Sequence, residues 1–177
     1  MFYGLDWEAV PFYFDAEEPD YYRCDLLMTC VDKASVRVAI GSRVSASWDR
    51  PDLWLDFGNA ERTGQVVLGH LSDNAGASLR LPNVFDLYPE LSDVDDDDAP
   101  SCSLEAAIRS QDLFINRLVA DIGLSLLWDL LRKGCLERHG GFVDLAQGTV
   151  TPLLINSESW RMFGYAPSEP VSDPPTA

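Results

Sequence analysis

The sequence predicts an α/β fold, with a Rossmann-like sheet, helices that cover it and a C-terminal β-hairpin. An apolar run over residues 22–31, a helical pattern over 34–44 and a second apolar run over 53–58 follow one another in the order of a βαβ unit. A long amphipathic helix later ends at Gly134, after two basic residues. With 177 residues, 46% of them hydrophobic, the chain is long enough for one domain with a core.

The first half of the chain predicts strand, helix, strand and strand. Residues 1–20 carry many apolar side chains, as expected of a segment that packs against other structure. Residues 22–31 are typical of a strand buried on both faces of a parallel sheet. Residues 34–44 predict a helix, and residues 53–58 and 64–71 predict two more strands. The strand, helix, strand order predicts a parallel sheet with a right-handed crossover.

Two features mark the C-terminal part of the chain. Residues 141–145 and 149–153 flank Ala146-Gln147-Gly148, which is typical of a β-hairpin. From residue 166 to residue 177 the chain is rich in Pro, Ser and acidic residues, which predicts a disordered tail. The folded domain is therefore expected to cover residues 1–165.

The stretch Pro82–Gly134 carries the strongest pattern in the sequence. It begins with an extended loop, passes through the acidic run Asp93–Asp98 and reaches Cys102 just before a helix over 104–133. One straight helix of that length would measure about 45 Å, so a break near Ser110 is expected. Apolar residues recur every three or four positions and predict one buried face. These residues are Ile115, Leu118, Val119, Ile122, Leu126 and Leu130.

The composition argues against some classes of partner. The formal charge of −16, from 13 basic and 29 acidic residues, disfavours nucleic acid and anionic membranes, because both attract cationic surfaces. The charge fits a basic partner or a solvated acidic surface. No apolar run approaches the roughly 20 residues of a membrane span, and the sequence shows no signal peptide. We therefore expect a cytoplasmic protein whose four cysteines are reduced thiols.

Asp32 is the first candidate ligand residue. It follows the predicted buried strand, and the carboxyl ends of parallel strands form the edge where α/β sheets bind ligands. We predict that this strand is central and that the Asp32 side chain lies in a cleft, where a carboxylate can hold Mg²⁺ against phosphates. The alternative is that Asp32 caps the helix that begins at Ala34. Arg37 either reaches the same edge or lies on the surface.

Cys102 is the best candidate nucleophile, because it lies between a flexible acidic loop and a helix. Neighbouring aspartates would raise its pKa, against the effect of the helix dipole, so an unreactive thiol is the alternative. Cys24 and Cys30 would lie about 20 Å apart along a strand, too far for a disulfide, and are expected in the core. His70 and His139 belong to no motif and are expected to be structural. The acidic run is expected to be a solvated loop, with metal binding as the alternative.

Several stretches resemble one protein family. The segment Cys30-Val31-Asp32, followed by Arg37, resembles the Cys-Thr-Asp-Asn-Phe-x-x-Arg motif of the ThiF/MoeB/HesA family, the bacterial relatives of ubiquitin-activating enzymes. Further stretches resemble the ThiF-family proteins of the PRTRC system, over about residues 4–154. They are LDFGN from Leu55, GQVVLG from Gly64, PNVFDLYP from Pro82, PSCSL from Pro100, QDLFIN from Gln111 and HGGF from His139.

The resemblance implies an ATP-dependent adenylyltransferase that activates the C-terminal glycine of a ubiquitin-like or sulfur-carrier-type protein. It implies ATP and Mg²⁺ as cofactors, with Asp32 serving both, Arg37 nearby and Cys102 as a thiol acceptor. A homodimer is also possible. Lys33 departs from the family's asparagine. The family's glycine-rich ATP loop precedes the part of the domain that this chain matches, so the resemblance implies an N-terminally truncated ThiF-type sheet, the C-terminal part of the domain.

Two other functions compete with this interpretation. In the first, the chain is a non-catalytic interaction module that keeps a surface for a ubiquitin-like carrier or a ThiF-family partner and does not bind ATP. In the second, it is a Rossmann-like oxidoreductase, but the sequence has neither a G-x-G-x-x-G fingerprint nor a P-loop. Without a phosphate-cradling loop, the isolated chain is expected to form no acyl-adenylate.

Overall fold

The computed structural model describes residues 8–9, 11, 14–15, 24–42, 52–71, 79–94 and 112–167. Several predicted features lie outside these residues. They are Cys102, most of the acidic run, the start of the predicted long helix before residue 112 and the tail after residue 167.

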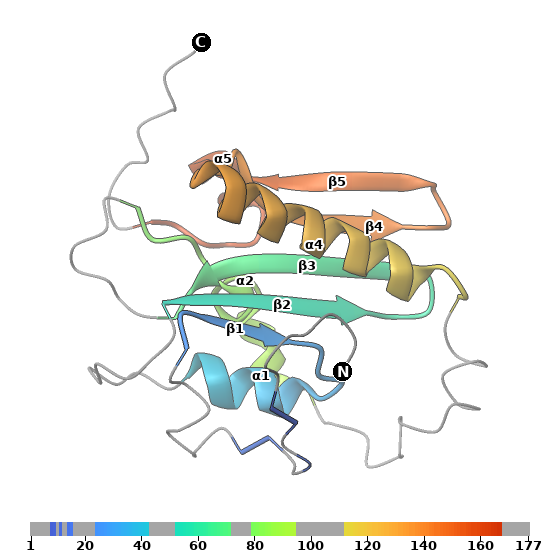
Figure 1. Ribbon diagram of the computed structural model, residues 1–177, viewed down its shortest axis with the longest axis horizontal. Coiled ribbons are helices and arrows are strands. Elements are labelled where there is room, and N and C mark those ends of the chain that lie inside the picture. Colours follow the sequence, from blue (N-terminus) through green and yellow to red (C-terminus); the bar gives the residue numbers. More distant parts are fainter. Residues whose placement is uncertain are drawn as a thin grey trace.

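The described residues form an α/β fold around one mixed sheet of five strands, in the spatial order β1-β2-β3-β4-β5 (Figure 1). Only β1 and β2 are parallel, whereas β2–β3, β3–β4 and β4–β5 are antiparallel pairs. The strands are β1 (Leu26–Thr29), β2 (Leu53–Asn59), β3 (Thr63–His70), β4 (Arg138–Asp144) and β5 (Thr149–Leu154). The α/β class predicted from the sequence is thereby confirmed.

Helices cover both faces of this sheet. They are α1 (Ala34–Gly41), α2 (Val84–Leu87), the 3₁₀ helix η2 (Pro89–Asp93), α4 (Ile115–Lys133) and α5 (Ser157–Arg161). Helix α4 lies along one face (Figure 1), and α1, α2, η2 and α5 contribute to the core on the other. No helix among these residues is long and apolar enough to cross a membrane.

The parallel sheet was predicted correctly only for its first two strands. The β1-α1-β2 unit is parallel, as the strand, helix, strand order implied. Strand β3 instead turns back antiparallel to β2, because residues 60–62 form a link far too short for a parallel crossover of a dozen or more residues. Further along the chain, β4 and β5 pair antiparallel and are joined by residues 145–148.

Strand β1 differs from its prediction in both burial and position. It lies at one end of the described sheet, and the prediction of a central strand buried on both faces was wrong. Its residue Met28 is 43% exposed. Cys24 and Cys30, which flank the strand, are exposed and are not core residues as predicted.

Alternating side chains of β2 and β3 build two cores. Trp54 and Val67 point to the face shared with α1, α2 and α5, whereas Leu55, Val66 and Leu68 point to the face covered by α4. The first core is completed by Ile40, Val84, Leu87, Leu153 and Trp160, and the second by Ile115, Val119, Leu126 and Val143.

The predicted inward face of α4 is confirmed. Ile115, Val119 and Leu126 are almost fully buried. Leu118, Ile122 and Leu130 are partly buried and pack against the same core. The helix stops at Gly134 as predicted. Gly134 adopts a left-handed φ of 67° and donates its N–H to the carbonyl oxygen of Leu130.

Candidate functional site

A buried ion pair joins α1 to the end of the parallel strand pair. Thr29, the last residue of β1, lies opposite Asp56 of β2. Arg37 of α1 donates from Nε to Asp56 Oδ2 at 2.9 Å and from Nη2 to the carbonyl oxygen of Phe57 at 3.0 Å. Asp56 is 1% exposed and Arg37 7% exposed. The sheet therefore holds the first helix by two charge-assisted contacts.

Two further hydrogen bonds complete this network. The Thr29 hydroxyl donates to Asp56 Oδ1 at 2.6 Å, and Trp54 Nε1 donates to the Thr29 hydroxyl oxygen at 2.8 Å. Burial raises the pKa of the Asp56 carboxyl above its ordinary value, while the Arg37 charge and the Thr29 bond act to lower it. Both carboxylate oxygens of Asp56 thus have hydrogen-bond donors, which is what a buried charge requires.

Of the two predicted alternatives, Arg37 follows the first, because it reaches the same edge of the sheet as Asp32. It reaches the end of the strand pair, but its guanidinium contacts Asp56 and Phe57 instead of projecting into an open site. It is also not a surface residue. This arrangement does not fit a phosphate ligand, because binding a phosphate through Nε would require breaking the ion pair with Asp56.

Asp32 lies in the loop between β1 and α1, at the carboxyl end of the parallel pair. Asp32 is exposed and follows the edge strand of the described sheet, and its place in a cleft stays a prediction. Lys33, and not Asp32, takes the N-cap position of α1, and the Lys33 side chain makes no cap bond.

The fit of Asp32 to Mg²⁺ is partial. An exposed carboxylate matches the way Mg²⁺ binds beside a nucleotide, through one or two carboxylates and the substrate phosphates. Within the described ranges, no group of three His, Cys, Asp or Glu residues lies close enough to hold a metal ion by itself. Asp32 thus fits a metal only together with phosphate oxygens.

The two cysteines that flank β1 are not activated thiols. Partial burial, followed by the charge of Asp56, raises the pKa of Cys30, and the Arg37 charge only partly offsets this. Partial burial and the Asp25 charge likewise raise the pKa of Cys24. A raised pKa lowers the thiolate fraction at neutral pH, so neither cysteine is a good nucleophile.

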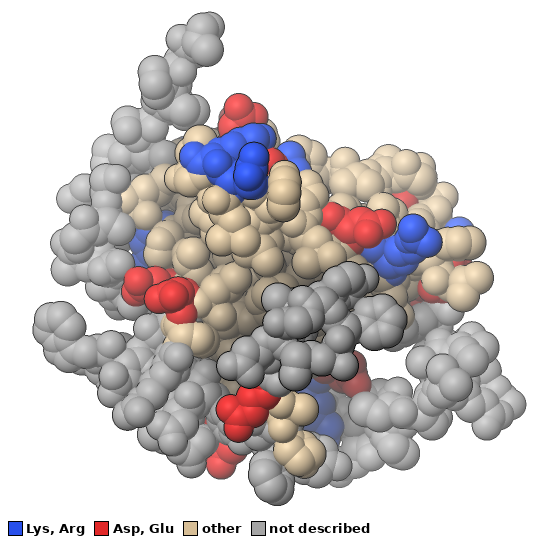
Figure 2. Space-filling model, viewed as in Figure 1, with Lys and Arg blue, Asp and Glu red and all other residues tan. Residues whose placement is uncertain are grey.

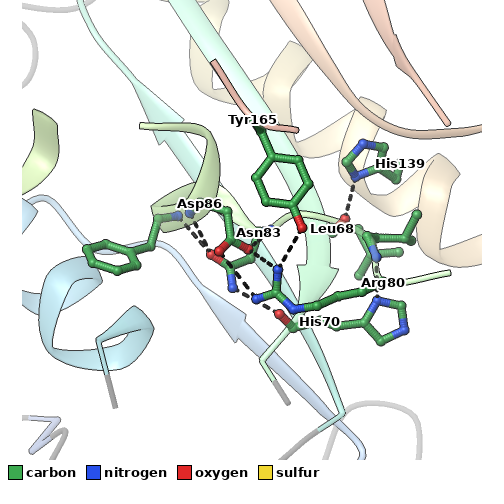
Figure 3. Close-up of polar contacts among 9 residues, drawn as sticks. Leu68, His70, Arg80, Asn83, Asp86, His139 and Tyr165 are labelled. Carbon is green, nitrogen blue, oxygen red and sulfur yellow. Dashed lines mark hydrogen bonds and ion pairs between the residues drawn. The ribbon is translucent and has the colours of Figure 1, made fainter. Parts of the chain in front are cut away.

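A second polar cluster fixes the segment that leads towards Cys102. Asn83 caps α2: its side-chain oxygen accepts from the N–H groups of Phe85 and Asp86, and Asp86 accepts from the N–H of Asn83 (Figure 3). This is a capping box. The Asn83 amide also donates to the carbonyl oxygen of His70, the last residue of β3. The segment is thereby joined to the sheet.

Arg80 links the same segment to the C-terminal part of the fold. Its guanidinium pairs with Asp86 at 2.9 Å and donates to the Tyr165 hydroxyl at 3.2 Å (Figure 3). Gly69 of β3 lets the backbone around Asn83 lie close to the strand, because a Cβ on Gly69 would lie 2.3 Å from the Cα of Asn83. The PNVFDLYP stretch that carries part of the family resemblance is therefore a capped and docked segment in this structure.

His139 is a structural residue, as predicted, and it anchors α5. Trp160 Nε1 donates to His139 Nε2 at 2.7 Å, so the proton of the neutral ring must be on Nδ1, which donates to the Leu68 carbonyl oxygen at 2.7 Å. The residue is fully buried, and burial lowers its pKa to about 4. Protonation of Nε2 would remove the acceptor for Trp160.

We expect this histidine to make stability depend on pH. The unfolded chain binds the proton near pH 6.5 and the folded protein near pH 4. The free energy of unfolding therefore falls as the pH drops through this interval, by about 1.4 kcal/mol per pH unit and about 3 kcal/mol in total. Urea titrations of wild type and His139→Gln across this range measure the effect, and the variant should show a flatter dependence. His70 contributes to the slope that remains in the variant, because burial lowers its pKa as well, and equal slopes for wild type and His139→Gln would contradict the assignment.

Comparisons with known proteins add no family to this geometry. No protein-family model matches the sequence, and no curated protein matches it. The family resemblance therefore rests on the residue stretches themselves, and the function drawn from it is a proposal.

Two of the three candidate residues lie near one sheet end, as predicted, but their most important neighbour, Asp56, was not among the candidates. Asp32 and Arg37 both lie at the β1–α1 junction, whereas Cys102 lies outside the described residues. Asp56 was not considered. Its signal was a single carboxylate inside the apolar run of β2, since a charged residue in a buried strand requires a partner.

Proposed function

We propose that this chain belongs to a ThiF-type adenylyltransferase, which uses ATP and Mg²⁺ to activate the C-terminal glycine of a ubiquitin-like protein. One structural observation carries the proposal: the parallel β1-α1-β2 unit presents exposed Asp32 at its carboxyl end, where open α/β sheets bind ligands. In this role Asp32 serves the Mg²⁺ that bridges the nucleotide phosphates.

The described contacts also assign a supporting role to the ion pair. Arg37 and Asp56 hold the first turns of α1 against β2, and α1 begins two residues after Asp32. Arg37 thus positions the loop that carries Asp32 and does not itself bind phosphate. Cys102 keeps its proposed role as a thiol acceptor and lies outside the described residues, further along the chain than α2, which Asn83 and Asp86 cap.

The proposal requires phosphate contacts from other residues. Nucleotide-binding α/β folds hold phosphates with backbone N–H groups of a glycine-rich loop at a helix N-terminus, and this sequence contains neither G-x-G-x-x-G nor a P-loop. A second polypeptide or segment that carries such a loop would have to complete the site. The chain by itself is expected to bind ATP no more tightly than about millimolar, near −4 kcal/mol.

A non-catalytic interaction module is the second candidate, and the geometry of Arg37 favours it. With Arg37 engaged by Asp56 and Phe57, Asp32 is the one exposed charged residue left among the described members of the predicted ATP site. In this alternative the chain binds a ubiquitin-like carrier or a ThiF-family subunit and leaves nucleotide chemistry to its partner.

Pyrophosphate exchange distinguishes the two functions. The assay contains the purified chain, ATP, Mg²⁺ and a ubiquitin-like protein that ends in glycine, with and without a ThiF-type subunit that carries the glycine-rich loop. We expect no exchange with the chain alone, and exchange with the added subunit that is lost in Asp32→Asn. Asp25→Asn, at the other end of β1, is the control and should keep activity.

The remaining outcomes each count against part of the proposal. Exchange by the chain alone would show that it holds the phosphates without an added loop. Pyrophosphate exchange that persists in Asp32→Asn would show that Asp32 is not needed to bind the metal. If no mixture gives exchange but the carrier protein still binds in a pull-down with purified components, the interaction module is the better account.

A further inference from the structure

A groove lies between helix α4 and the strands β4 and β5, whereas Asp32 follows β1 at the other edge of the described sheet. Its volume is about 310 Å³, at the lower end of the range of small-molecule sites, which is about 300–1,000 Å³. Figure 2 shows this face of the molecule, where uncharged atoms cover most of the area over α4 and β5. The groove is therefore large enough for a small organic molecule and is separate from the proposed nucleotide site.

The floor of the groove is apolar, and it is hollow because a glycine stands where a side chain would fill it. Gly141 of β4 pairs with Pro152 of β5, and a Cβ on Gly141 would lie 3.3 Å from Cγ2 of Ile122 on α4. Val150 precedes Pro152 by two residues and thus lies on the same face of the sheet. All four residues line the groove, so the space beside Gly141 offers apolar contacts to a ligand.

A half-buried arginine lies at one end of the groove. Arg138, the first residue of β4, donates from Nη2 to the Ser125 hydroxyl oxygen at 3.4 Å, which is long for a hydrogen bond. The structure shows no other side-chain hydrogen bond of Arg138 to a described residue, so most of its five donors are available to a ligand. The nearby carboxylate of Asp129 pairs with Lys133 at 2.8 Å. A guanidinium beside a hydroxyl is well suited to bind a carboxylate.

An acidic residue lies at the other end of the groove. Asp121 lines it one helical turn before Ser125, about 6 Å away along the helix axis. Residues four apart lie on the same face of a helix. Asp121 also lies 3.8 Å from Arg117, but both side chains are exposed and such pairs contribute little. The groove therefore has a negative end, an apolar middle and a positive end.

We propose that this groove binds a short zwitterionic peptide, namely a dipeptide with apolar side chains. The carboxylate of the dipeptide accepts hydrogen bonds from the Arg138 guanidinium and the Ser125 hydroxyl, and its ammonium group donates to Asp121. Its side chains contact Gly141 and Pro152. Two extended residues span about 7 Å, which matches the separation of about 6 Å between the two ends of the groove.

The arrangement of charges favours a dipeptide over other small carboxylates. The ammonium and carboxylate groups of a free α-amino acid are attached to one carbon atom, so they are too close together to reach both ends. A simple apolar carboxylate would leave Asp121 unpaired and would be repelled by a chain with a formal charge of −16. A dipeptide has no net charge and pairs with both ends, whereas the termini of a longer peptide would lie beyond them.

Titration of the whole chain with leucyl-leucine at neutral pH, followed by the NMR shifts of the backbone amides, tests the proposal. We expect saturable shifts at Gly141 and Val150. Arg138→Gln and Asp121→Asn should each weaken binding at least about tenfold, because each removes one charge-assisted hydrogen bond. Arg161→Gln is the matched control, since it removes the same charge from α5, which packs on the opposite face of the sheet, and should leave the affinity unchanged. The dispersion of the amide spectrum shows whether each variant is folded.

Changes to the ligand test which end each group occupies. Acetyl-leucyl-leucine lacks the ammonium group and leucyl-leucinamide lacks the carboxylate, so each should bind at least about tenfold more weakly than leucyl-leucine. Arg138→Gln should weaken the binding of leucyl-leucine but not of leucyl-leucinamide, because the amide has already lost the partner of this arginine. Glycylglycine has no apolar side chains and should give no saturable shift.

Four results would overturn the proposal. The first is the absence of saturable shifts up to about 10 mM leucyl-leucine, a concentration at which even a millimolar ligand is mostly bound. The second is an unchanged affinity in Arg138→Gln. The third is equal binding of acetyl-leucyl-leucine, which would make the ligand a simple carboxylate, and the fourth is equal binding of glycylglycine or of a peptide of four leucines. No arm of this experiment contains ATP or a carrier protein, so its failure is distinct from a failure of the proposed function.

Discussion

Replacement of Asp56 by alanine is expected to destabilise the fold by about 3–5 kcal/mol, the usual cost of removing one member of a buried ion pair. The variant leaves the Arg37 guanidinium buried beside β2 without its carboxylate and removes the acceptor of the Thr29 hydroxyl. An uncompensated buried charge costs more free energy than a missing hydrogen bond, so Asp56→Ala should lower the free energy of unfolding more than Thr29→Ala does. Urea denaturation followed by tryptophan fluorescence measures the difference.

Two controls separate the charge effect from a general packing defect. The double variant Arg37→Met/Asp56→Leu removes both charges and should recover most of the lost stability, because apolar replacements of buried pairs are often neutral. Arg62→Ala breaks the exposed pair with Asp112, whose atoms lie 3.8 Å apart, and should cost at most about 1 kcal/mol. A loss below 1 kcal/mol for Asp56→Ala would contradict the buried network.

Replacement of Leu126 by alanine is expected to cost about 2–5 kcal/mol, because it opens a cavity in a packed core. Leu126 is fully buried beneath α4, where it shares a core with Leu55 and Leu68 of the central strands. The helix bridges β2, β3 and β4, so a defect there weakens the attachment of α4 to the whole sheet. The midpoint of a urea titration should fall, with little change in its slope.

Leu113→Ala is the matched control for this variant. Leu113 lies in the turn before α4 and is 84% exposed, so its replacement should stay within about 0.5 kcal/mol. Equal losses at Leu113 and Leu126 would mean that the inward face of the helix has been misassigned.

Patterns local in sequence were predicted best. The inward face and the end of α4 follow from the spacing of its leucines, its basic last turn and Gly134, and each of these acts within a few residues. The parallel arrangement of β1 and β2 also follows from local order, since a helix separates them. The direction of β3 could have been predicted from the short link over 60–62, because link length decides between parallel and antiparallel pairing.

Features that depend on distant residues could not be predicted. The burial of β1 depends on how many strands lie beyond it, and no local pattern contains that number. The partner of Asp56 is on another element, so the sequence could indicate that a partner is needed but not that it is Arg37. For the same reason Asp32 was placed correctly at the end of its strand, whereas the strand itself lies at the edge of the described sheet and not at its centre.

The pairing of β3 with β4 has a consequence for how this chain folds. The β2–β3 and β4–β5 pairs each join residues that are close in the chain, whereas the β3–β4 ladder joins residues as far apart as Thr63 and Asp144. Closing such a long loop costs conformational entropy before the stabilising contacts of the ladder form, and this cost slows folding. We therefore expect the two local pairs to form first and their association along the β3–β4 ladder, beneath α4, to set the folding rate.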